Sequence, residues 1–280
     1  MELKPETVRL LWFAGGLALF YLVESGVHTR PWHDSRSKRL VFHAFLAVLN
    51  TALMKLAVAG PLLYWTLIVE ARGWGLARWM GLTGVTEIVA TVIILDCADY
   101  WWHLWNHRIP LLWRFHQAHH VDTHVDVTTS LRFHPGELLL SGVVKAVWLL
   151  VWGPSMLAFA IFEASVSLAA QYHHSNFDYP DRVETALRTL TVTPRMHASH
   201  HSAMTPTLNS NYSILFSVWD RLFGTYIPPT AEHLEVQGLP YGRDRHLDLG
   251  YWFTMPFDRL PTDEELEGVI ASKRDSSKSD

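Results

Sequence analysis

The chain has 280 residues, a formal net charge of −4 and an apolar composition, with 49% hydrophobic and only 18% charged residues. Such a composition is unusual for a soluble protein of this length, so it favours apolar membrane spans joined to a soluble cap. The single cysteine, Cys97, excludes a disulfide framework, a four-thiolate zinc site and a cysteine-ligated iron–sulfur cluster.

Five apolar runs follow one another along the chain, and strand signals are weak throughout. The runs cover residues 10–24, 40–69, 81–102, 138–152 and 156–170. The third has the length needed to cross a bilayer core of roughly 30 Å at a rise of about 1.5 Å per helical residue. The sequence therefore predicts an all-α integral membrane protein with about four to five apolar helices and a histidine-rich helical cap.

Two Gly-Pro pairs interrupt this pattern. Gly60-Pro61 forms a break inside the second run, and Gly153-Pro154 separates the fourth run from the fifth. The last two runs have about 15 residues each, so they can form a hairpin that enters the bilayer only in part. The first run is expected to be retained, because its leading segment has as many acids as bases and no A-x-A cleavage site follows.

Basic residues set the expected orientation. The loop at residues 26–40 carries four lysines or arginines, whereas the loop at residues 70–80 carries two. Under the positive-inside rule the first loop is cytoplasmic, so the third run returns to the cytoplasm at His103. The histidine clusters should then lie on the cytoplasmic face of the membrane.

We interpret residues 1–280 as a single domain, because no internal repeat or low-complexity stretch divides the sequence. Its histidine-rich region spans residues 96–228. The polar tail from about residue 264 is expected to be disordered.

Histidine is the most unusual feature, with 17 residues, of which 12 lie between His103 and His201. They form three short clusters, HLWNH at 103–107, HQAHH at 116–120 and HASHH at 197–201. Spacings of three and four residues place the rings of each cluster on one face of a helix. The clustered residues are His103, His107, His116, His119, His120, His197, His200 and His201.

Eight histidines are too many for one metal ion, because a site uses about three to six ligands and catalysis needs an open position. Two metal ions are therefore implied, and neutral imidazole suits iron, zinc, copper or nickel. A single HxxxH is explained by a chance helical pair at least as well as by a metal site. Three such clusters in one chain are not explained by chance. Histidines that stand alone are assigned no metal role; they are His28, His33, His43, His124, His233 and His246.

Two aspartates lie where they could hold a ligating imidazole, whose second ring N–H needs an acceptor. Asp99 lies one helical turn before His103, and Asp96 lies one turn earlier, so both share the face of His103 and His107. Charged residues within an apolar span are costly and usually functional. Both aspartates are therefore candidates to support or bind the metal.

Other polar residues are harder to rank. Glu163 shares a helical face with His174, but an ion pair with Lys145 across the hairpin explains it equally well. Spacing alone does not rank the further candidates Asp122, Asp126, Asn176 and Asn211.

The motifs, in this order, resemble those of the fatty acid hydroxylase superfamily, and within it the bacterial sterol desaturase-like branch. The resemblance covers roughly residues 30–228 and includes DYWWHLWNHRIPLLWRFHQAHH, FHPGE, HHSN, TPRMHASHH and NSNYSILFSVWDRLFGTY. It implies an integral membrane oxygenase of the bacterial inner membrane with a histidine-rich site for two iron ions. Such an enzyme uses O2 and external electrons to hydroxylate or desaturate a lipid.

Carried over residue by residue, the resemblance assigns nine metal ligands, namely His103 and His107, then His116, His119 and His120, then His174, and finally His197, His200 and His201. His134 and His173 match positions that bind the metal or support a ligand. Ala170 stands where fatty acid 2-hydroxylases have a further histidine, which disfavours that branch. Ala198-Ser199 also departs from the usual Arg-Val pair.

The leading hypothesis is an O2-dependent lipid hydroxylase or desaturase that takes its substrate laterally from the bilayer. The sequence lacks a G-x-G-x-x-G motif, a thiolate cluster and a haem domain. Electrons should therefore come from a separate cytochrome, ferredoxin or reductase, with no bound flavin, haem or nicotinamide. No nucleic-acid partner is expected.

Two other functional classes compete with this hypothesis. A membrane zinc-dependent hydrolase is the alternative, weakened because no H-E-x-x-H motif occurs and no glutamate stands beside a histidine cluster. A metal transporter would be expected to carry its histidines within the spans and not at their ends.

Overall fold

The computed structural model describes residues 5–32, 34–204 and 206–262. All regular elements in these ranges are helices, and the β contacts there are two isolated bridges, His28 with Phe177 and Ser202 with Gln237. The predicted all-α class is therefore confirmed. His33 and the predicted disordered tail from residue 264 lie outside the described residues.

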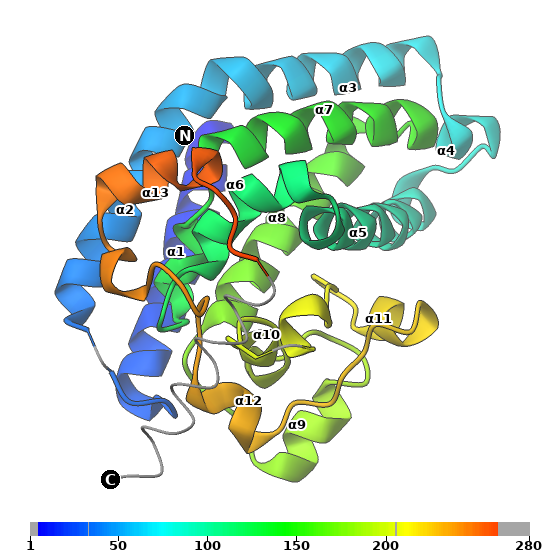
Figure 1. Ribbon diagram of the computed structural model, residues 1–280. Helices are drawn as coiled ribbons and strands as arrows, with labels where there is room; N and C mark the ends of the chain where they lie inside the picture. The colour runs from blue at the N-terminus through cyan, green and yellow to red at the C-terminus, as the bar shows by residue number, and fades with distance from the viewer. Residues whose placement is uncertain (1–4, 33, 205, 263–280) are drawn as a thin grey trace, which may run out of the picture.

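Long helices form the body of the molecule (Figure 1). Helix α3 runs beside α7, while α8 packs against both α1 and α5. The long helices are α1 (Pro5–Val27), α2 (Arg36–Met54), α3 (Gly60–Arg72), α5 (Gly84–Arg108), α7 (Pro135–Trp152) and α8 (Met156–His174).

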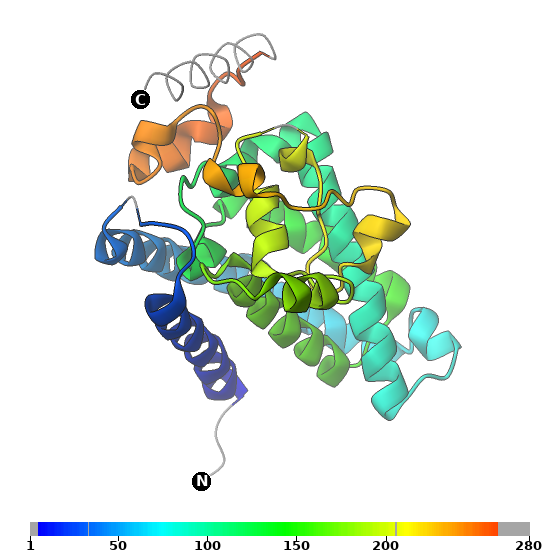
Figure 2. The same ribbon diagram turned by 90° about the horizontal axis from the view of Figure 1, so that it is seen from below.

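Short helices form a cap over one side of this body, where Figure 2 shows α9 to α12 gathered together. Helix α6 (Pro110–His120) connects the body to this side, and α4 (Leu76–Trp79) lies away from it, between α3 and α5. The remaining short elements are η2 (Val127–Leu131), α9 (Asp181–Leu187), α10 (Pro194–His200), η3 (Thr207–Asn209), α11 (Val218–Leu222), α12 (Ala231–Glu235), η4 (Arg243–Arg245), α13 (Leu249–Thr254) and η5 (Met255–Phe257).

The Gly60-Pro61 pair does not break the second apolar run as the sequence suggested. A π-helical turn, η1 (Lys55–Ala59), joins α2 to α3, and the Gly60 N–H donates to the Lys55 carbonyl five residues earlier. Proline lacks the N–H of a regular helical bond and crowds the preceding turn. A wider turn ahead of Pro61 accommodates both effects, so the helix continues from α2 into α3.

The hairpin of α7 and α8 has well-defined helix ends. His134 Nδ1 accepts a hydrogen bond from the Gly136 N–H, and Pro135 occupies the first turn of α7. At the other end Gly153 has φ +72°, and a Cβ there would clash with the Trp74 carbonyl oxygen. Only glycine fits this close approach. The two helices have 18 and 19 residues, so each is longer than the short run predicted for it.

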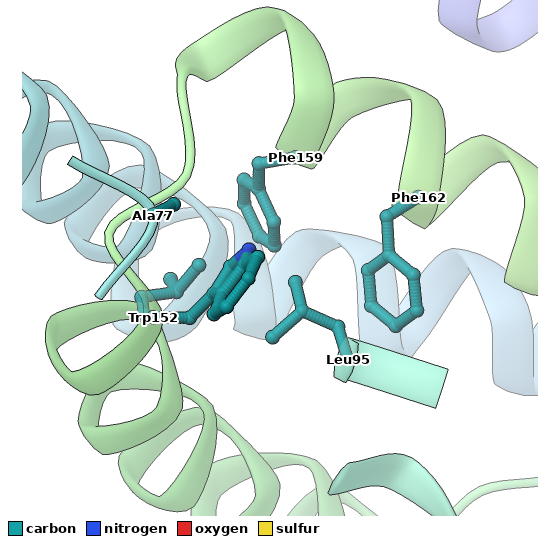
Figure 3. Close-up of a cluster of buried hydrophobic side chains, with 6 residues drawn as sticks. Ala77, Leu95, Trp152, Phe159 and Phe162 are labelled. Atoms are coloured by element: carbon teal, nitrogen blue, oxygen red, sulfur yellow. The ribbon is translucent and has the colours of Figure 1, made fainter. Parts of the chain in front are cut away.

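A buried hydrophobic cluster packs the hairpin against α4 and α5 (Figure 3). Within it the Trp152 indole N–H donates to Thr91 Oγ1 at 2.9 Å, so its polar atom is satisfied. Burial of each large apolar side chain stabilises the fold by roughly 1.5–3 kcal/mol. The cluster consists of Ala77, Leu95, Leu149, Trp152, Phe159 and Phe162.

Two helical stretches, Arg36–Trp79 and Pro135–Trp152, are long and apolar enough to cross a membrane, and Leu11–Val27 is a shorter apolar helix. Large side chains on the two longer stretches stay exposed, with Leu56 at 82% and Val143 at 67%. The predicted span at α5 is not among them, since this helix carries three acidic residues in its apolar part. The number and orientation of the spans therefore stay predictions.

A buried arginine ties α2 to the loop after α6. The fully buried Arg39 donates two hydrogen bonds to the Asp122 carboxylate, at 2.6 and 2.9 Å, and one to Asp126 at 2.8 Å. Its guanidinium also reaches the His124 carbonyl oxygen at 2.5 Å. The ion pairs fix the chain where it leaves the second histidine cluster.

We predict that Arg39→Met lowers the free energy of unfolding by about 3–5 kcal/mol, because two buried carboxylates lose their paired cation. Unfolding of the detergent-solubilised protein can be followed by tryptophan fluorescence. Arg182→Met, the same change at an exposed arginine of α9, is the matched control and should shift stability by no more than about 0.5 kcal/mol. Equal stability of the two variants would contradict a structural role for the Arg39 ion pairs.

Candidate metal centre

The eight clustered histidines and His174 converge in two groups at the ends of α5, α6, α8 and α10. Within each group, the ring nitrogens available to an ion lie within 4.8 Å of one another. No further histidine of the described ranges joins either group. The first group is His103, His107, His116, His120 and His200, and the second group is His119, His174, His197 and His201.

The spacing of ring nitrogens fits a shared ion. In the second group, Nε2 atoms lie 3.1 Å apart for His119 and His174, 3.0 Å for His174 and His197, and 3.2 Å for His197 and His201. One pair of the first group repeats this spacing at 3.1 Å. Two nitrogens bound at right angles to one ion, each at about 2.1 Å, would lie about 3.0 Å apart. The rings are therefore close enough to share a cation.

Backbone carbonyls fix the tautomer of four rings. A carbonyl oxygen can only accept, so each Nδ1 carries the proton and each Nε2 keeps its lone pair for an ion. The acceptors are Tyr212 for His103 at 2.8 Å, Ser210 for His200 at 2.7 Å, Arg132 for His119 at 3.2 Å and Ala170 for His174 at 2.6 Å.

Several buried ring nitrogens have no hydrogen-bond partner within the described part of the chain. They include Nε2 of His200 and both nitrogens of His107 in the first group, and Nδ1 of His201 in the second. A buried polar atom left unpaired costs about 1–3 kcal/mol. A bound cation would give the lone pairs of the first group a partner, and the closely spaced Nε2 atoms of the second group offer a comparable site, so the residues present fit two metal ions.

Burial keeps four of the rings, His120, His174, His200 and His201, uncharged. It lowers the pKa of His200 to about 3 and that of His174 to about 4. Burial, together with neighbouring imidazoles, also holds the pKa of His120 and His201 well below the usual value. A neutral imidazole offers its lone pair without first losing a proton, so these rings can bind a cation at neutral pH.

Glu137 is a site residue that the sequence analysis missed. It is 4% exposed, and its Oε1 accepts a hydrogen bond from His116 Nδ1 at 3.0 Å. Its other oxygen, Oε2, is buried without a partner among the described residues. The contact crosses from α7 to α6, so spacing along one helix could not reveal it. The available signal was FHPGE, where His134 and Pro135 begin α7 and place Glu137 in its first turn.

The two aspartates expected to support the ligands do not bond to them. Asp96 accepts hydrogen bonds from the backbone N–H of Leu215 and Phe216 at 2.9 and 3.1 Å, and from the Trp219 indole at 2.7 Å. It therefore anchors a cap segment to α5. For Asp99, no hydrogen bond from a histidine occurs among the described residues. Carbonyl oxygens and Glu137 take the supporting role instead.

His134 and His173 lie outside both groups. His134 caps α7, and its Nε2 lies 3.3 Å from the Phe253 carbonyl oxygen, so the structure gives it a role in holding the helix that carries Glu137. The ring centre of His173 lies 4.0 Å from that of His197. A role for His173 in supporting this ligand stays a prediction.

Three of the other polar candidates lie in loops around the site and bond to neighbouring helices. Asp122 and Asp126 hold Arg39, and Asn211 bonds to Ser199 Oγ at 3.3 Å within α10. His43, which was given no metal role, lies outside both groups and bonds through Nδ1 to Thr128 Oγ1 at 2.7 Å.

A cavity of about 220 Å³ leads from the histidines into the body, between α5, α7 and α8. Near the histidines its walls include His103, His116, His119, His174 and His197. Apolar walls come from Trp102, Phe133, Leu138, Val166 and Ile214. A hydrocarbon chain placed in this cavity would therefore face both histidine groups.

We predict that the purified full-length protein binds two Co²⁺ ions per chain, one for each group. His200→Ala should lose the ion of the first group and His119→Ala that of the second, because each removes a lone pair from one group only. His233→Ala, outside both groups, should retain both ions. Metal content is measured by plasma mass spectrometry after dialysis. Full retention in both site variants would contradict the two-ion assignment.

We predict that Glu137→Gln weakens metal binding by the first group by about 10–100-fold, because an amide is a poorer acceptor for the His116 N–H. The second group should keep its affinity. Titration against a competing chelator measures both constants, with Glu232→Gln, at an exposed position, as the control. An equal loss in both groups would indicate a general structural defect and would contradict the assigned role.

Comparison with known proteins agrees with the site. The fatty acid hydroxylase family model matches residues 88–225. Alkylglycerol monooxygenase of Xenopus tropicalis is 28% identical over 145 residues, which cover 49% of this chain and 30% of that protein. Ornithine lipid hydroxylase OlsE of Rhizobium tropici is 29% identical over 144 residues, or 51% and 42%. Sphingolipid C4-hydroxylase sur2 of Schizosaccharomyces pombe is 27% identical over 203 residues, or 71% and 63%.

The match spans less than half the length of the first two of these relatives. No solved structure was found to match the chain. The residues matched by the family model contain both histidine groups and Glu137. On this match, and on the relatives that share it, residues 88–225 of the chain are assigned to the fatty acid hydroxylase family.

Proposed function

We propose that the protein is a membrane-bound oxygenase with two iron ions that hydroxylates a lipid using O2 and external electrons. The observation that carries the proposal is the convergence of nine buried imidazoles, in two groups, at the end of a largely apolar cavity. The three relatives described above are named as lipid hydroxylases or monooxygenases, which supports the same reaction class.

The reaction inserts one oxygen atom of O2 into a C–H bond and reduces the other to water, consuming two electrons and two protons. Iron, when bound, would supply the redox chemistry that activates O2. Imidazole suits iron, and the two groups would each hold one ion. Desaturation of the lipid is the other reaction that the family resemblance implies.

The residues of the chain orient the ligand rings, shield the site from water and position the lipid. The carbonyl oxygens of Tyr212 and Ser210 hold the first group's His103 and His200 as Nδ1–H tautomers, while Glu137 orients His116. The rings of both groups are at most 9% exposed, so water is largely excluded from the reacting space. The apolar cavity walls would place a hydrocarbon segment beside the metal ions.

The substrate would enter laterally from the membrane. The cavity lies between α5, α7 and α8, and α7 is one of the helices able to cross a bilayer. With the more basic loop at residues 26–40 on the cytoplasmic side, the histidines would lie at the cytoplasmic surface of the membrane. A separate protein on this side would donate the electrons.

A membrane zinc-dependent hydrolase is the second candidate. No glutamate stands beside a histidine cluster in the sequence, but the fold brings Glu137 next to one. Glu137 lies beside His116 with one oxygen unpaired, as a group that activates water would. An oxygen-independent reaction with zinc is the distinguishing property of this candidate.

We predict that anaerobically purified protein loaded with Fe²⁺ consumes O2 when it receives a chemical reductant and a lipid extract of its host. Heavy-isotope O2 should leave one labelled oxygen atom in a lipid, as detected by mass spectrometry. His119→Ala and His200→Ala should lose at least about 100-fold of this activity, since each removes a ligand, whereas His233→Ala should retain it. Turnover that needs zinc and proceeds without O2 would establish the hydrolase instead.

A further inference from the structure

The inner end of the cavity carries a charged cluster that the metal chemistry does not use. Lys145 of α7, Asp99 of α5 and Ser141 of α7 all line the cavity. We infer that this cluster binds a neutral hydroxyl group of the lipid, at a set distance from the carbon that reacts. The inference deepens the proposed function and rests on it, because it names the substrate class of the same cavity.

Helix α7 forms the cavity wall that connects the charged cluster to the metal site. Glu137, Ser141 and Lys145 follow one another at intervals of four residues, so they form a single stripe along α7. At about 1.5 Å per residue, Lys145 lies about 12 Å further along the helix than Glu137. A lipid anchored at Lys145 would thus reach the histidines with a carbon at a fixed position along its chain.

Charges in the cluster are incompletely paired. Lys145 Nζ donates to Glu163 Oε1 at 2.7 Å, and Asp99 is a second carboxylate within electrostatic range of this ammonium group. Lysine has three N–H donors, of which this bond uses one. No hydrogen bond to the Asp99 carboxylate occurs among the described residues. A donor and an acceptor therefore remain available to a ligand.

A purely structural role explains the cluster poorly. The ion pair of Lys145 and Glu163 is only partly buried, with side-chain exposures of 18% and 42%, and such a pair contributes little to stability. The hairpin of α7 and α8 already has its own hydrophobic cluster and its glycine turn. Charged residues between apolar helices are costly and usually functional. Their position on the cavity wall supplies the function.

The charge balance selects the ligand. Lys145 and Asp99 on the cavity wall balance each other in charge, and Glu163 outside the lining already pairs with the same ammonium, so no surplus positive charge is left to bind a carboxylate or phosphate. A hydroxyl group can accept from Lys145 and donate to Asp99 at the same time, and the Ser141 hydroxyl can serve either purpose. An alcohol therefore satisfies the cluster, whereas an alkane would leave its polar groups unpaired.

The test uses photoactivatable probes on the detergent-solubilised full-length protein. The probes are a long-chain primary alcohol with a diazirine at mid-chain, the matching carboxylic acid and the matching alkane. Labelled peptides are identified by mass spectrometry. We expect the alcohol to label peptides of α7 and α8 at least tenfold more than the other two probes. Equal labelling by the acid or the alkane would overturn the inference.

Two substitutions and a matched control assign the selectivity to the cluster. Lys145→Met should reduce alcohol labelling at least tenfold, whereas Lys55→Met, in the apolar stretch between α2 and α3 and away from the cavity, should leave it unchanged. Asp99→Asn removes one negative charge, so labelling by the acid should rise at least threefold. This gain keeps the inference testable if Lys145→Met fails to fold. Unchanged labelling in folded Lys145→Met would overturn the inference.

Probe binding requires neither O2 nor electrons, so it is separate from the oxygenase test. His119→Ala should lose oxygenation but keep selective alcohol labelling. Oxygenation without alcohol selectivity would refute the cluster's role alone, and selectivity without oxygenation would refute the proposed reaction alone.

Discussion

Nine imidazoles, packed with little access to water, direct lone pairs toward one another in two small spaces. This arrangement is unfavourable unless a cation shares the lone pairs, since buried polar atoms without partners are expensive. The ring N–H groups on the other side need acceptors, and these come from distant parts of the chain. Tyr212 and Ser210 belong to the cap, whereas Ala170 belongs to α8. The body and the cap therefore have to meet at the histidines.

Buried charges hold the segments that supply these acceptors. Asp220 accepts hydrogen bonds from the backbone N–H groups of Tyr212 and Ser213, at 2.7 and 3.0 Å, and so fixes the carbonyl group that faces His103. Arg39 does the equivalent for the loop after α6. The helices of the cap are short, so hydrogen bonds of this kind, more than regular secondary structure, determine the shape of the cap.

Apolar runs without strand signals were sufficient to predict the all-α class. Helical spacing grouped the eight clustered histidines, because residues three or four apart share a face whatever the rest of the fold does, whereas His174 was found only through the family resemblance. Contacts between helices were not predictable in this way. Glu137 reaches His116 across two helices, and Asp96 turned toward the cap although its spacing placed it on the face of His103. The π turn before Pro61 also escaped prediction, since a proline in an apolar run usually signals a break.

The three hydrogen bonds from residues 215–219 to Asp96 connect the cap to the interior of α5, about 10 Å along the helix from His103. The cap cannot swing aside like a hinged lid without breaking them, so opening the site toward water would amount to partial unfolding. In the proposed membrane setting the lipid then exchanges only sideways, between helices. The effective concentration of the substrate is then the mole fraction of that lipid in the bilayer. Adding more water around the membrane leaves the occupancy of the cavity unchanged.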